Sequence, residues 1–534
     1  MKKSTLRLVL MFTALLLASC VKKEYITIES TPEEPKDEST YTIMMYGCGG
    51  GNLDYFMATN IQEALLTGST DRVKFTGQIK FSQAYQQYKA EGAAGTQRFI
   101  VGSEPISWYW PEEELPADLA LYDPQTLTDF INWSKEKCPA DEYILLLWNH
   151  GGAWAPYDDG GVVPELGSRG VVYDDVFDGK PGLSLNALVE GIQNSGTKMK
   201  MIYYDACLMG MVEILSELTD CADYVLGASH ITPGMGGDYD SLIYNLNNST
   251  NFEQAIENYI KETMAHWNGS GMPLDLMLVD LSKMDQLLSV VKDFSTILAE
   301  VGEIANENKE AIENNDENIN VNDAFLTLIF QEAINSIYWY ETSIFTDNAD
   351  LTVREYPYFD LLNFAEILAA TNYPSTYNSK FITIASRLNR AFNEAIVFKA
   401  LSNNLYGMNL SMGVAITDAT VWNKYGWNQA YPSLKFDQAT GWSNWVSENK
   451  FTPTGNPNPD NFTSSSESEP ENGDEGEGEG EGDDWYGDEG EGEGDDSYGD
   501  EEGDDSYGDE GGGDMSMQDM IFIQLVLEII STRN

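Results

Sequence analysis

The sequence predicts an α/β fold: a mostly parallel sheet flanked by helices, then a mainly helical C-terminal region and a disordered acidic tail. Residues 143–148 and 201–206 are continuous apolar runs, a composition typical of parallel strands that are buried on both faces. Segments with the apolar spacing of helices separate such runs, as they do in sheets built from alternating strands and helices. From residue 251 to residue 450 helical spacing dominates.

The chain begins with the features of an export signal. Residues 1–7 are basic, and the apolar run 8–17 is too short to span a bilayer comfortably. The run ends in Leu17-Ala18-Ser19-Cys20, which is similar to a bacterial lipobox, where Cys20 would be acylated; a plain secretion signal with an incidental Cys is the alternative. Residues 21–40 are charged and contain two prolines, which favours a flexible tether. We therefore expect a lipid-anchored protein of the bacterial cell envelope, on the periplasmic face or the cell surface.

The predicted elements follow the chain in order. Strands are expected near 41–48, 73–83, 143–148, 201–206 and 222–229, with helices near 60–67, 125–137, 184–195 and 208–219. The later helices are expected near 252–267, 284–307, 322–340, 358–370 and 379–400, with a strand pair between 405 and 417. The predicted parts are a signal peptide (1–20), a tether (21–40), a sheet domain (41–250), a helical region (251–450), an acidic tail (451–516) and a short apolar segment (517–534).

The tail gives the chain much of its formal charge of −57. Residues 451–516 contain 25 Asp or Glu and no Lys or Arg, so charge repulsion and glycine entropy should keep them disordered. A solvated spacer, weak Ca²⁺ capture and attraction of basic partners are the alternatives for its role. The final apolar segment is too short to span a bilayer and would be a docking helix or an added strand. This acidity disfavours nucleic-acid binding.

Cysteine usage excludes two further classes of protein. Without Cys20 the chain keeps four cysteines, which is too few for a disulfide framework in an exported chain of this length. Neither Cys-x-x-Cys nor His-Glu-x-x-His spacing occurs, so nothing supports a structural zinc site or a zinc peptidase. We expect no required cofactor, and Ca²⁺ binding stays open.

The two apolar runs each end in a reactive side chain. His150 follows the first and is itself followed by Gly151 and Gly152, and Cys207 follows the second. Functional groups of open α/β sheets gather beyond the C-terminal ends of the strands, so the thiol and the imidazole should meet there. This pair is the minimum set for a cysteine nucleophile with a general base. The alternative for Cys207 is a small buried hydrophobic side chain.

Both strand ends resemble the signature blocks of the clostripain-like cysteine peptidases, which belong to the caspase-like group. The blocks are Asn149-His150-Gly151-Gly152 and Asp205-Ala206-Cys207-Leu208-Met209-Gly210. The resemblance extends to residues 41–46, 51–54, 60–63, 227–229 and 233–239, so it covers about residues 41–245 and weakly the chain as far as about 450. It implies a caspase-like peptidase domain over residues 41–250.

The resemblance implies roles for these residues. Cys207 would be the nucleophile, His150 would be the base and later the acid, and the backbone N–H groups of Cys207 and Gly151 would hold the oxyanion. Family members cleave after Arg or Lys, and Asp205 and Asp238 fall where the family places the carboxylates of its pocket. A buried guanidinium needs such a partner. The alternatives are a helix N-cap for Asp205 and ordinary turn chemistry for Asp238.

Two positions depart from the family pattern, and one loop is a candidate for self-cleavage. Gly237 stands where members commonly carry Trp, and His230 stands where they commonly carry an acidic residue. Members tend to mature by cutting themselves between the two strands, here in the loop 153–182. The candidate sites are Arg169 and Lys180, and ordinary loop charges are the alternative.

We therefore expect an exported, lipid-anchored cysteine endopeptidase that acts on proteins or peptides after Arg or Lys. A surface binding lipoprotein that keeps the fold without proteolysis is the main alternative, and a metal-dependent hydrolase built on the acidic residues is the other.

Overall fold

The computed structural model describes residues 39–50, 53–82, 95–109, 111–154, 170–174, 177, 181–267, 272–314, 320–340, 358–371, 373, 375–417, 419–424 and 426–451. By its contacts the chain separates into two units, 1–466 and 467–534, and the second lies wholly outside the described residues. The predicted signal peptide with Cys20, nearly all of the tether, the acidic tail beyond residue 451 and the apolar end also lie outside them.

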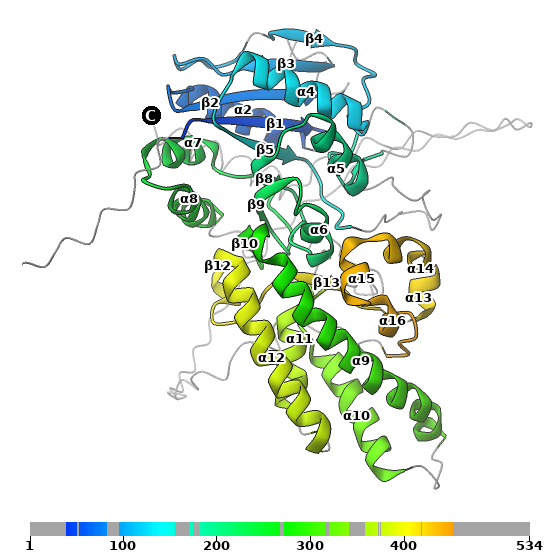
Figure 1. Ribbon diagram of the computed structural model, residues 1–534. Helices are drawn as coiled ribbons and strands as arrows, with labels where there is room; N and C mark the ends of the chain where they lie inside the picture. The colour runs from blue at the N-terminus through cyan, green and yellow to red at the C-terminus, as the bar shows by residue number, and fades with distance from the viewer. Residues whose placement is uncertain are drawn as a thin grey trace, which may run out of the picture. The chain divides into compact units, whose positions relative to one another are not determined.

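Among the described residues, nine strands form one sheet in the order β12-β10-β9-β8-β5-β1-β2-β3-β4 (Figure 1). The middle five are parallel, which confirms the predicted fold class: β1 (Tyr41–Cys48), β2 (Val73–Lys80), β5 (Glu142–Trp148), β8 (Met199–Asp205) and β9 (Ala222–Gly227). Antiparallel strands extend both edges: β3 (Thr96–Ile100), β4 (Glu113–Leu115), β10 (Asp275–Asp280) and β12 (Ile396–Leu401).

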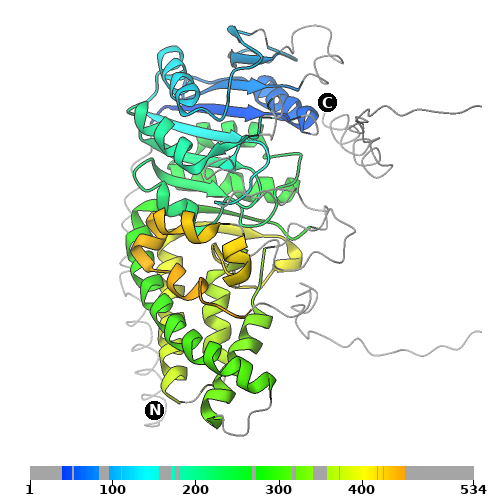
Figure 2. The same cartoon turned by 90° about the vertical axis from the view of Figure 1, so that its right-hand side faces the viewer.

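Helices bury both faces of the sheet (Figures 1 and 2). One face packs against α4 (Pro124–Lys137), α5 (Leu185–Asn194) and α6 (Val212–Glu217), and the other against α2 (Asp54–Thr67), α7 (Tyr239–Asn248) and α8 (Phe252–His266). Along β1, Met44 and Tyr46 join the first core while Ile43 and Met45 join the second. Burial on both faces is why these strands are apolar without alternation.

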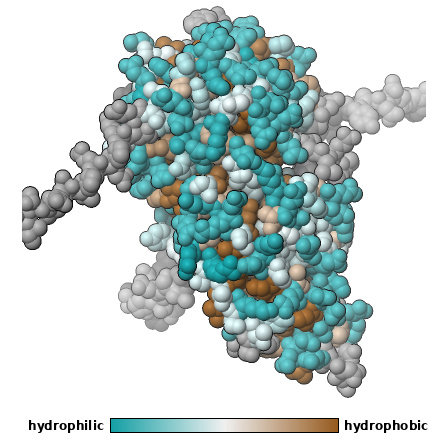
Figure 3. All heavy atoms as spheres, in the orientation of Figure 1, coloured by the Kyte–Doolittle hydropathy of each residue, from teal (hydrophilic) through white to brown (hydrophobic). Residues whose placement is uncertain are grey.

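The helical region packs on the α6 side of the sheet and shares its hydrophobic core. Its long helices are α9 (Met284–Glu313), α10 (Val321–Ser336), α11 (Leu361–Ala370) and α12 (Ser375–Ala395). Shorter elements complete the helical region: β11 (Tyr358–Asp360), β13 (Gly413–Ala415), α13 (Ala419–Lys424), α14 (Trp427–Ala430), α15 (Lys435–Thr440), α16 (Ser443–Val446) and 3₁₀ turns at Leu281–Lys283, Asn403–Leu405 and Tyr431–Ser433. Between β5 and α5, β6 (Gly170–Val171) and β7 (Leu183–Ser184) form a separate antiparallel pair. In Figure 3 hydrophobic patches interrupt a largely hydrophilic surface over the long helices.

Several predicted elements need correction. The helix predicted over 379–400 ends at Ala395, and the chain continues as β12, because pairing with β10 overrides helical spacing. The segment 358–370 starts as β11 before it becomes α11, and the helix predicted from residue 208 begins at Val212. Of the strand pair predicted between 405 and 417, only β13 forms, and it pairs with β11.

Two other expectations concern cysteines and membranes. Cys48, Cys138, Cys207 and Cys221 are all free thiols. None of the helices in the described part of the chain has the length and apolarity to cross a bilayer.

Candidate active site

The parallel pairing of β5 and β8 brings the two predicted catalytic residues to one edge of the sheet. Trp148 pairs with Asp205 across the two strands. His150 lies two residues after Trp148, and Cys207 lies two residues after Asp205, so the two reactive residues leave the sheet at the same level. The N–H of Asn149 donates to the carbonyl of Asp205 at 3.5 Å, which extends the pairing past the strands. His150 is exposed and Cys207 is partly exposed, so the edge that carries them is open to solvent.

Gly151 lies directly against the backbone of Cys207. A Cβ at Gly151 would lie 2.0 Å from the carbonyl oxygen of Cys207 and 3.0 Å from its nitrogen, so only glycine fits here. The loop that carries His150 is therefore in contact with the residue predicted as nucleophile.

Backbone groups surround the thiol of Cys207. The N–H of Thr232 donates to Sγ at 3.3 Å, and Sγ lies 3.7 Å from the Thr232 carbonyl. Burial raises the pKa of Cys207, whereas the N–H groups of Thr232, Cys207 and Gly151 act to lower it. The N–H groups of Cys207 and Gly151, which were predicted to hold an oxyanion, thus both lie close enough to stabilise negative charge on the sulfur.

Three non-glycine residues near this edge adopt the left-handed backbone conformation. They are Ala153 (φ 59°), Val172 (φ 58°) and Leu208 (φ 60°). Such conformations cost about 1–3 kcal/mol and persist only where the surroundings impose them, and they cluster at functional sites. Leu208 follows Cys207 directly, and its N–H donates to the carbonyl of His230 at 2.9 Å.

Asp205 is buried beneath the loop that contains Gly237 and Tyr239. Its Oδ2 accepts hydrogen bonds from the Gly237 N–H at 2.8 Å and the Tyr239 hydroxyl at 2.7 Å. Burial raises the pKa of Asp205 to about 6, although both donors oppose this shift. No donor among the described residues is bonded to its other oxygen, Oδ1. The alternative role as a helix N-cap is wrong, because α6 begins later and its N-cap is Met211.

Asp238 stands at the N-terminal end of α7, where its side chain makes no capping hydrogen bond. Burial of Glu63, on α2, and secondly the charge of Asp238 raise the pKa of Glu63 to about 8. The N–H of Tyr239 donates to Glu63 at 3.3 Å. The structure thus gathers Asp205, Asp238 and Glu63 around one loop.

Asn60 and Glu63 also belong to this arrangement, although neither was predicted to have a role in the site. Asn60 donates to the carbonyls of Met235 (2.9 Å) and Gly237 (3.2 Å) and accepts from the indole of Trp148 (2.9 Å). The resemblance of residues 60–63 to the family was the signal that could have revealed it, because the burial of Asn60 is visible only in the structure.

The departure at Gly237 has a steric cause. A Cβ there would lie 2.1 Å from the hydroxyl of Tyr259 and 2.4 Å from that of Tyr203, and these two hydroxyls are bonded to each other at 2.8 Å. No side chain fits at this position in this chain.

A short segment of the loop 153–182 lies beside the His150 loop. The N–H of Gly152 donates to the carbonyl of Gly170 at 3.1 Å, and Gly151 bridges to Val171. Arg169 and Lys180, the candidate self-cleavage sites, lie outside the described residues, but their neighbours Gly170 and Pro181 lie within them.

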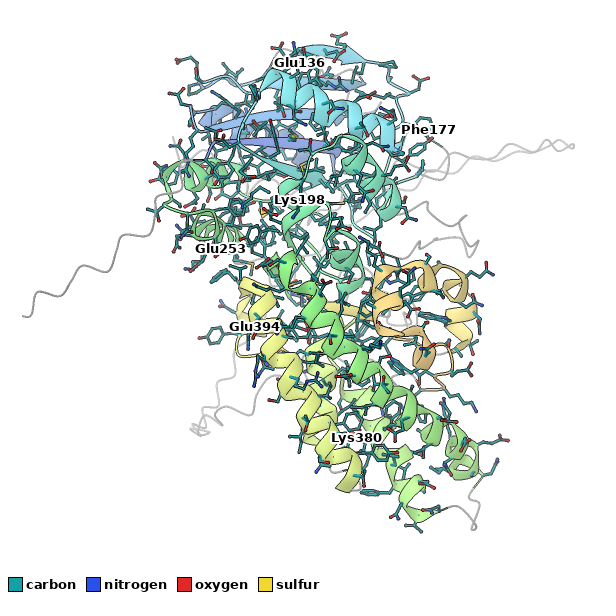
Figure 4. All side chains as sticks on the ribbon, viewed as in Figure 1. Glu136, Phe177, Lys198, Glu253, Lys380 and Glu394 are labelled. Carbon is teal, nitrogen blue, oxygen red and sulfur yellow. The ribbon has the colours of Figure 1, made fainter. Side chains whose placement is uncertain are left out.

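A buried ion pair anchors the same segment. Lys80 Nζ, at the end of β2, lies 2.6 Å from Asp174 Oδ2, and both side chains are fully buried. Nζ also donates to the Leu119 carbonyl at 2.6 Å and lies 5.3 Å from the ring centre of Phe177, which is labelled in Figure 4. The segment that follows Arg169 is therefore fixed to the sheet.

The turn after Cys207 is also tied to the helical region. The N–H of Gly413 donates to the carbonyl of Gly210 at 3.1 Å. Glu213 is fully buried on α6, and its Oε1 accepts from the Ala415 N–H at 2.8 Å and the Tyr431 hydroxyl at 2.7 Å. Burial raises the pKa of Glu213 to about 7.

No group of three or more His, Cys, Asp or Glu side chains within the described ranges is placed to hold a metal ion. The acidic stretch 452–516, the predicted source of weak Ca²⁺ capture, lies outside those ranges.

Known proteins resemble this chain in sequence and in fold. Residues 98–448 match the model of the clostripain family. Clostripain from Hathewaya histolytica is 23% identical over 419 residues, which are 70% of this chain and 74% of that protein. The chain is also similar in fold to the secreted C11 cysteine protease "iotapain" from Bacteroides thetaiotaomicron (TM-score 0.50, 17% identity, 75% of this chain and 99% of that one). A complex of a secreted C11 protease from that organism with an irreversible peptide inhibitor matches similarly (TM-score 0.50, 17% identity, 76% and 99%).

Proposed function

The chain belongs to the clostripain family of cysteine peptidases, and from this premise we propose that Cys207 and His150 cleave peptide bonds after Arg or Lys. The observation that carries the proposal is the contact of Gly151 with the backbone of Cys207, which joins the imidazole loop to the thiol turn.

In the proposed mechanism, His150 takes the proton of the Cys207 thiol, and the thiolate attacks the carbonyl carbon of the substrate. The N–H groups of Gly151 and Cys207 stabilise the oxyanion of the tetrahedral intermediate. His150 then protonates the leaving amine, and water hydrolyses the thioester with His150 acting as base. No step requires a cofactor.

Asp205 supports the proposed preference for Arg or Lys. Asp205 is the last residue of β8, the strand that leads to Cys207, and its Oδ1 has no bonded donor among the described residues. A carboxylate held on one oxygen by Gly237 and Tyr239 can accept a guanidinium or an ammonium group on the other. Asp238 adds a second carboxylate at the same loop, whereas Glu63, on α2, is mostly protonated near neutral pH because burial raises its pKa to about 8.

For self-processing, chemistry favours the bond between Arg169 and Gly170 over the bond between Lys180 and Pro181. Gly170 is bonded to Gly152, next to the proposed dyad. Proline after Lys180 lacks an N–H and restricts the residue before it, which makes that bond a poor substrate. Arg169→Ala should abolish fragmentation on a denaturing gel, and Lys180→Ala should leave it unchanged. Cleavage that persists in Arg169→Ala would contradict this choice.

Location remains a proposal from the sequence. We propose that Cys20 is acylated and anchors the enzyme in the cell envelope. Labelling of cells with a radioactive fatty acid should mark the wild-type chain and not Cys20→Ala.

The main experiment uses residues 21–534 beside the Cys207→Ala variant, with fluorogenic peptides that end in Arg, Lys, Asp or Leu, in Ca²⁺ or in EGTA. We expect turnover of Arg and Lys substrates in both conditions and none in the variant. No turnover of any substrate, with no labelling of Cys207 by a thiol-directed inhibitor, would favour the binding lipoprotein.

A further inference from the structure

We infer that His230 is a positioning residue for Cys207: together with Asp275 and Tyr338 it fixes the end of β9, which in turn holds the nucleophile turn. This inference rests on the proposed role of Cys207. His230 is fully buried, so its part would be structural support of the reacting group.

The side chain of His230 has a defined partner on each ring nitrogen. Nδ1 lies 3.0 Å from Asp275 Oδ1, on β10, and Nε2 lies 2.5 Å from the hydroxyl of Tyr338, which follows α10. With Nδ1–H donated to the carboxylate, Nε2 accepts from the Tyr338 O–H. The imidazole is fully buried, so water does not compete with Asp275 or Tyr338 for its ring nitrogens.

Asp275 binds the backbone at the same place. Its Oδ1 accepts the N–H of His230 at 2.8 Å, and its Oδ2 accepts the N–H of Ser229 at 3.0 Å. One carboxylate therefore takes three donors from two consecutive residues, which fixes both the main chain and the side chain at position 230.

This fixed strand end holds the turn that presents Cys207. The carbonyl of His230 accepts from Leu208, and two residues later the N–H of Thr232 donates to Sγ of Cys207. On the other side of His230, the Ser229 hydroxyl donates to the carbonyl of Gly210 at 2.9 Å. Hydrogen bonds from residues 229–232 thus hold the turn 207–210 at both of its ends, Cys207 and Gly210.

The left-handed conformation of Leu208 shows why such support is needed. A non-glycine residue holds φ near +60° only where neighbouring groups impose it. If the end of β9 relaxed, Leu208 would lose its partner, and the thiol would move relative to His150. A misplacement on the order of 1 Å can lower a rate about a hundredfold.

The surroundings of position 230 suit an imidazole and not an acidic side chain. Asp275 would repel an acidic side chain at position 230, whereas it binds the imidazole. Asp275 and Tyr338 therefore match an imidazole at position 230, because each binds one of its ring nitrogens.

Tyr338 and Tyr340 allow a matched test. Both rings contact the His230 ring edge-on, with centroids 5.5 and 4.6 Å away, and both side chains are buried. Only Tyr338 bonds the imidazole, because the hydroxyl of Tyr340 donates to Asp360 at 2.6 Å. Tyr338→Phe and Tyr340→Phe each remove one buried hydroxyl from the same segment, so loss of stability alone would affect both.

The experiment measures kcat and KM on an Arg substrate, the rate at which iodoacetamide alkylates Cys207, and the urea midpoint, for His230→Ala, His230→Asn and the two tyrosine variants. We expect kcat and the alkylation rate to fall about tenfold or more in His230→Ala and by less in Tyr338→Phe, with KM unchanged. His230→Asn, whose amide can still donate to Asp275, should recover part of the loss. Tyr340→Phe should change only the urea midpoint.

Equal kcat and alkylation rates in folded wild type, His230→Ala and Tyr338→Phe would overturn the inference. An equal loss in Tyr338→Phe and Tyr340→Phe would do the same, because it would reflect stability. Failure of the proposed function is distinguishable: the wild-type chain would then turn over no peptide, while the alkylation series would still report on the support of Cys207.

Discussion

The carbonyl oxygen of Cys207 occupies the space that a side chain at Gly151 would need: a Cβ there would lie 2.0 Å from it. Neither partner can move away easily, because Cys207 is held by Thr232 and Gly151 is bridged to Val171. The loop that carries His150 and the turn that carries Cys207 therefore keep their spacing only while residue 151 is glycine.

Gly151→Ala should consequently lower kcat/KM by about two orders of magnitude, because the added methyl group pushes the imidazole loop away from the thiol. Gly302→Ala, in α9, is the control, since nothing lies within 4 Å of a Cβ at that position. It should leave the activity unchanged and stabilise the fold by about 0.4–1 kcal/mol. Full activity of Gly151→Ala would show that this contact does not set the geometry of the site.

The pH dependence of activity on Arg substrates should report Asp205. Its pKa is raised to about 6 by burial, so the carboxylate is mostly neutral below that pH and charged above it. We expect kcat/KM for an Arg peptide to rise with pH through about 6, and Asp205→Asn to lower it by about two orders of magnitude. Tyr239→Phe removes one donor to the carboxylate, so it should move the rise to higher pH.

Asp223→Asn is the matched control for that series, because Asp223 pairs on the surface with Lys198, labelled in Figure 4. It should leave kcat/KM unchanged at every pH. If Asp205→Asn cleaved Arg peptides as well as the wild-type chain does, another carboxylate would have to bind the cation.

Folding stability should fall between pH 4.5 and pH 7 because of Glu213. Its pKa is raised by burial from 4.5 to about 7, so the folded state holds the proton more tightly than the unfolded state. The stabilisation is complete below pH 4.5 and is lost as the pH rises to about 7, at about 1.4 kcal/mol per unit of difference between the two pKa values. Glu213→Gln cannot ionise, so its unfolding free energy should vary less over this range.

Urea unfolding at pH 4.5, 6 and 7.5 measures how the free energy of unfolding depends on pH in the wild-type chain and in Glu213→Gln. Glu136→Gln is the control on an exposed helical position, labelled in Figure 4, and should follow the wild-type curve. Parallel curves for the wild-type chain and Glu213→Gln would mean that Glu213 ionises in the folded protein as it does in water.

Removal of one partner of the buried pair Lys80–Asp174 should be severe. Lys80→Met leaves a fully buried carboxylate without its cation, which costs about 3–5 kcal/mol. Replacing both partners, as in Lys80→Met with Asp174→Leu, should recover most of that loss. The surface pair Lys380–Glu300 offers a contrast, and Lys380→Ala should cost about 1 kcal/mol or less. A loss of that small size in Lys80→Met, measured by urea unfolding, would contradict the burial of the pair.

The parts of the fold that could be predicted are those whose burial is uniform. Strands β1, β5 and β8 are covered on both faces, so their sequences are mostly apolar, and His150 and Cys207 follow the ends of β5 and β8. The edge strands were missed for the opposite reason: β4 is the exposed sequence Glu113-Glu114-Leu115, and the residues of β12 are all partly exposed. Their pairing partners, and not their composition, determine their structure.

In the site, too, some residues could be predicted from the sequence and others depend on distant contacts. His150 and Cys207 follow from the rule that functional groups lie beyond parallel strands. The contributions of Asn60 and His230 depend on contacts with residues 175 and 108 positions away, Met235 and Tyr338, and neither spacing is visible in a local pattern.

The bonds from the nucleophile turn to the helical region also set an order of events during synthesis. Glu213 accepts hydrogen bonds from Ala415 and Tyr431, which lie 202 and 218 residues further along the chain. A ribosome releases Cys207 long before it has made these partners, and contacts of such long range form late. During much of translation the nascent polypeptide therefore carries α6, which follows the turn of Cys207, without the bonds that tie this helix to the helical region.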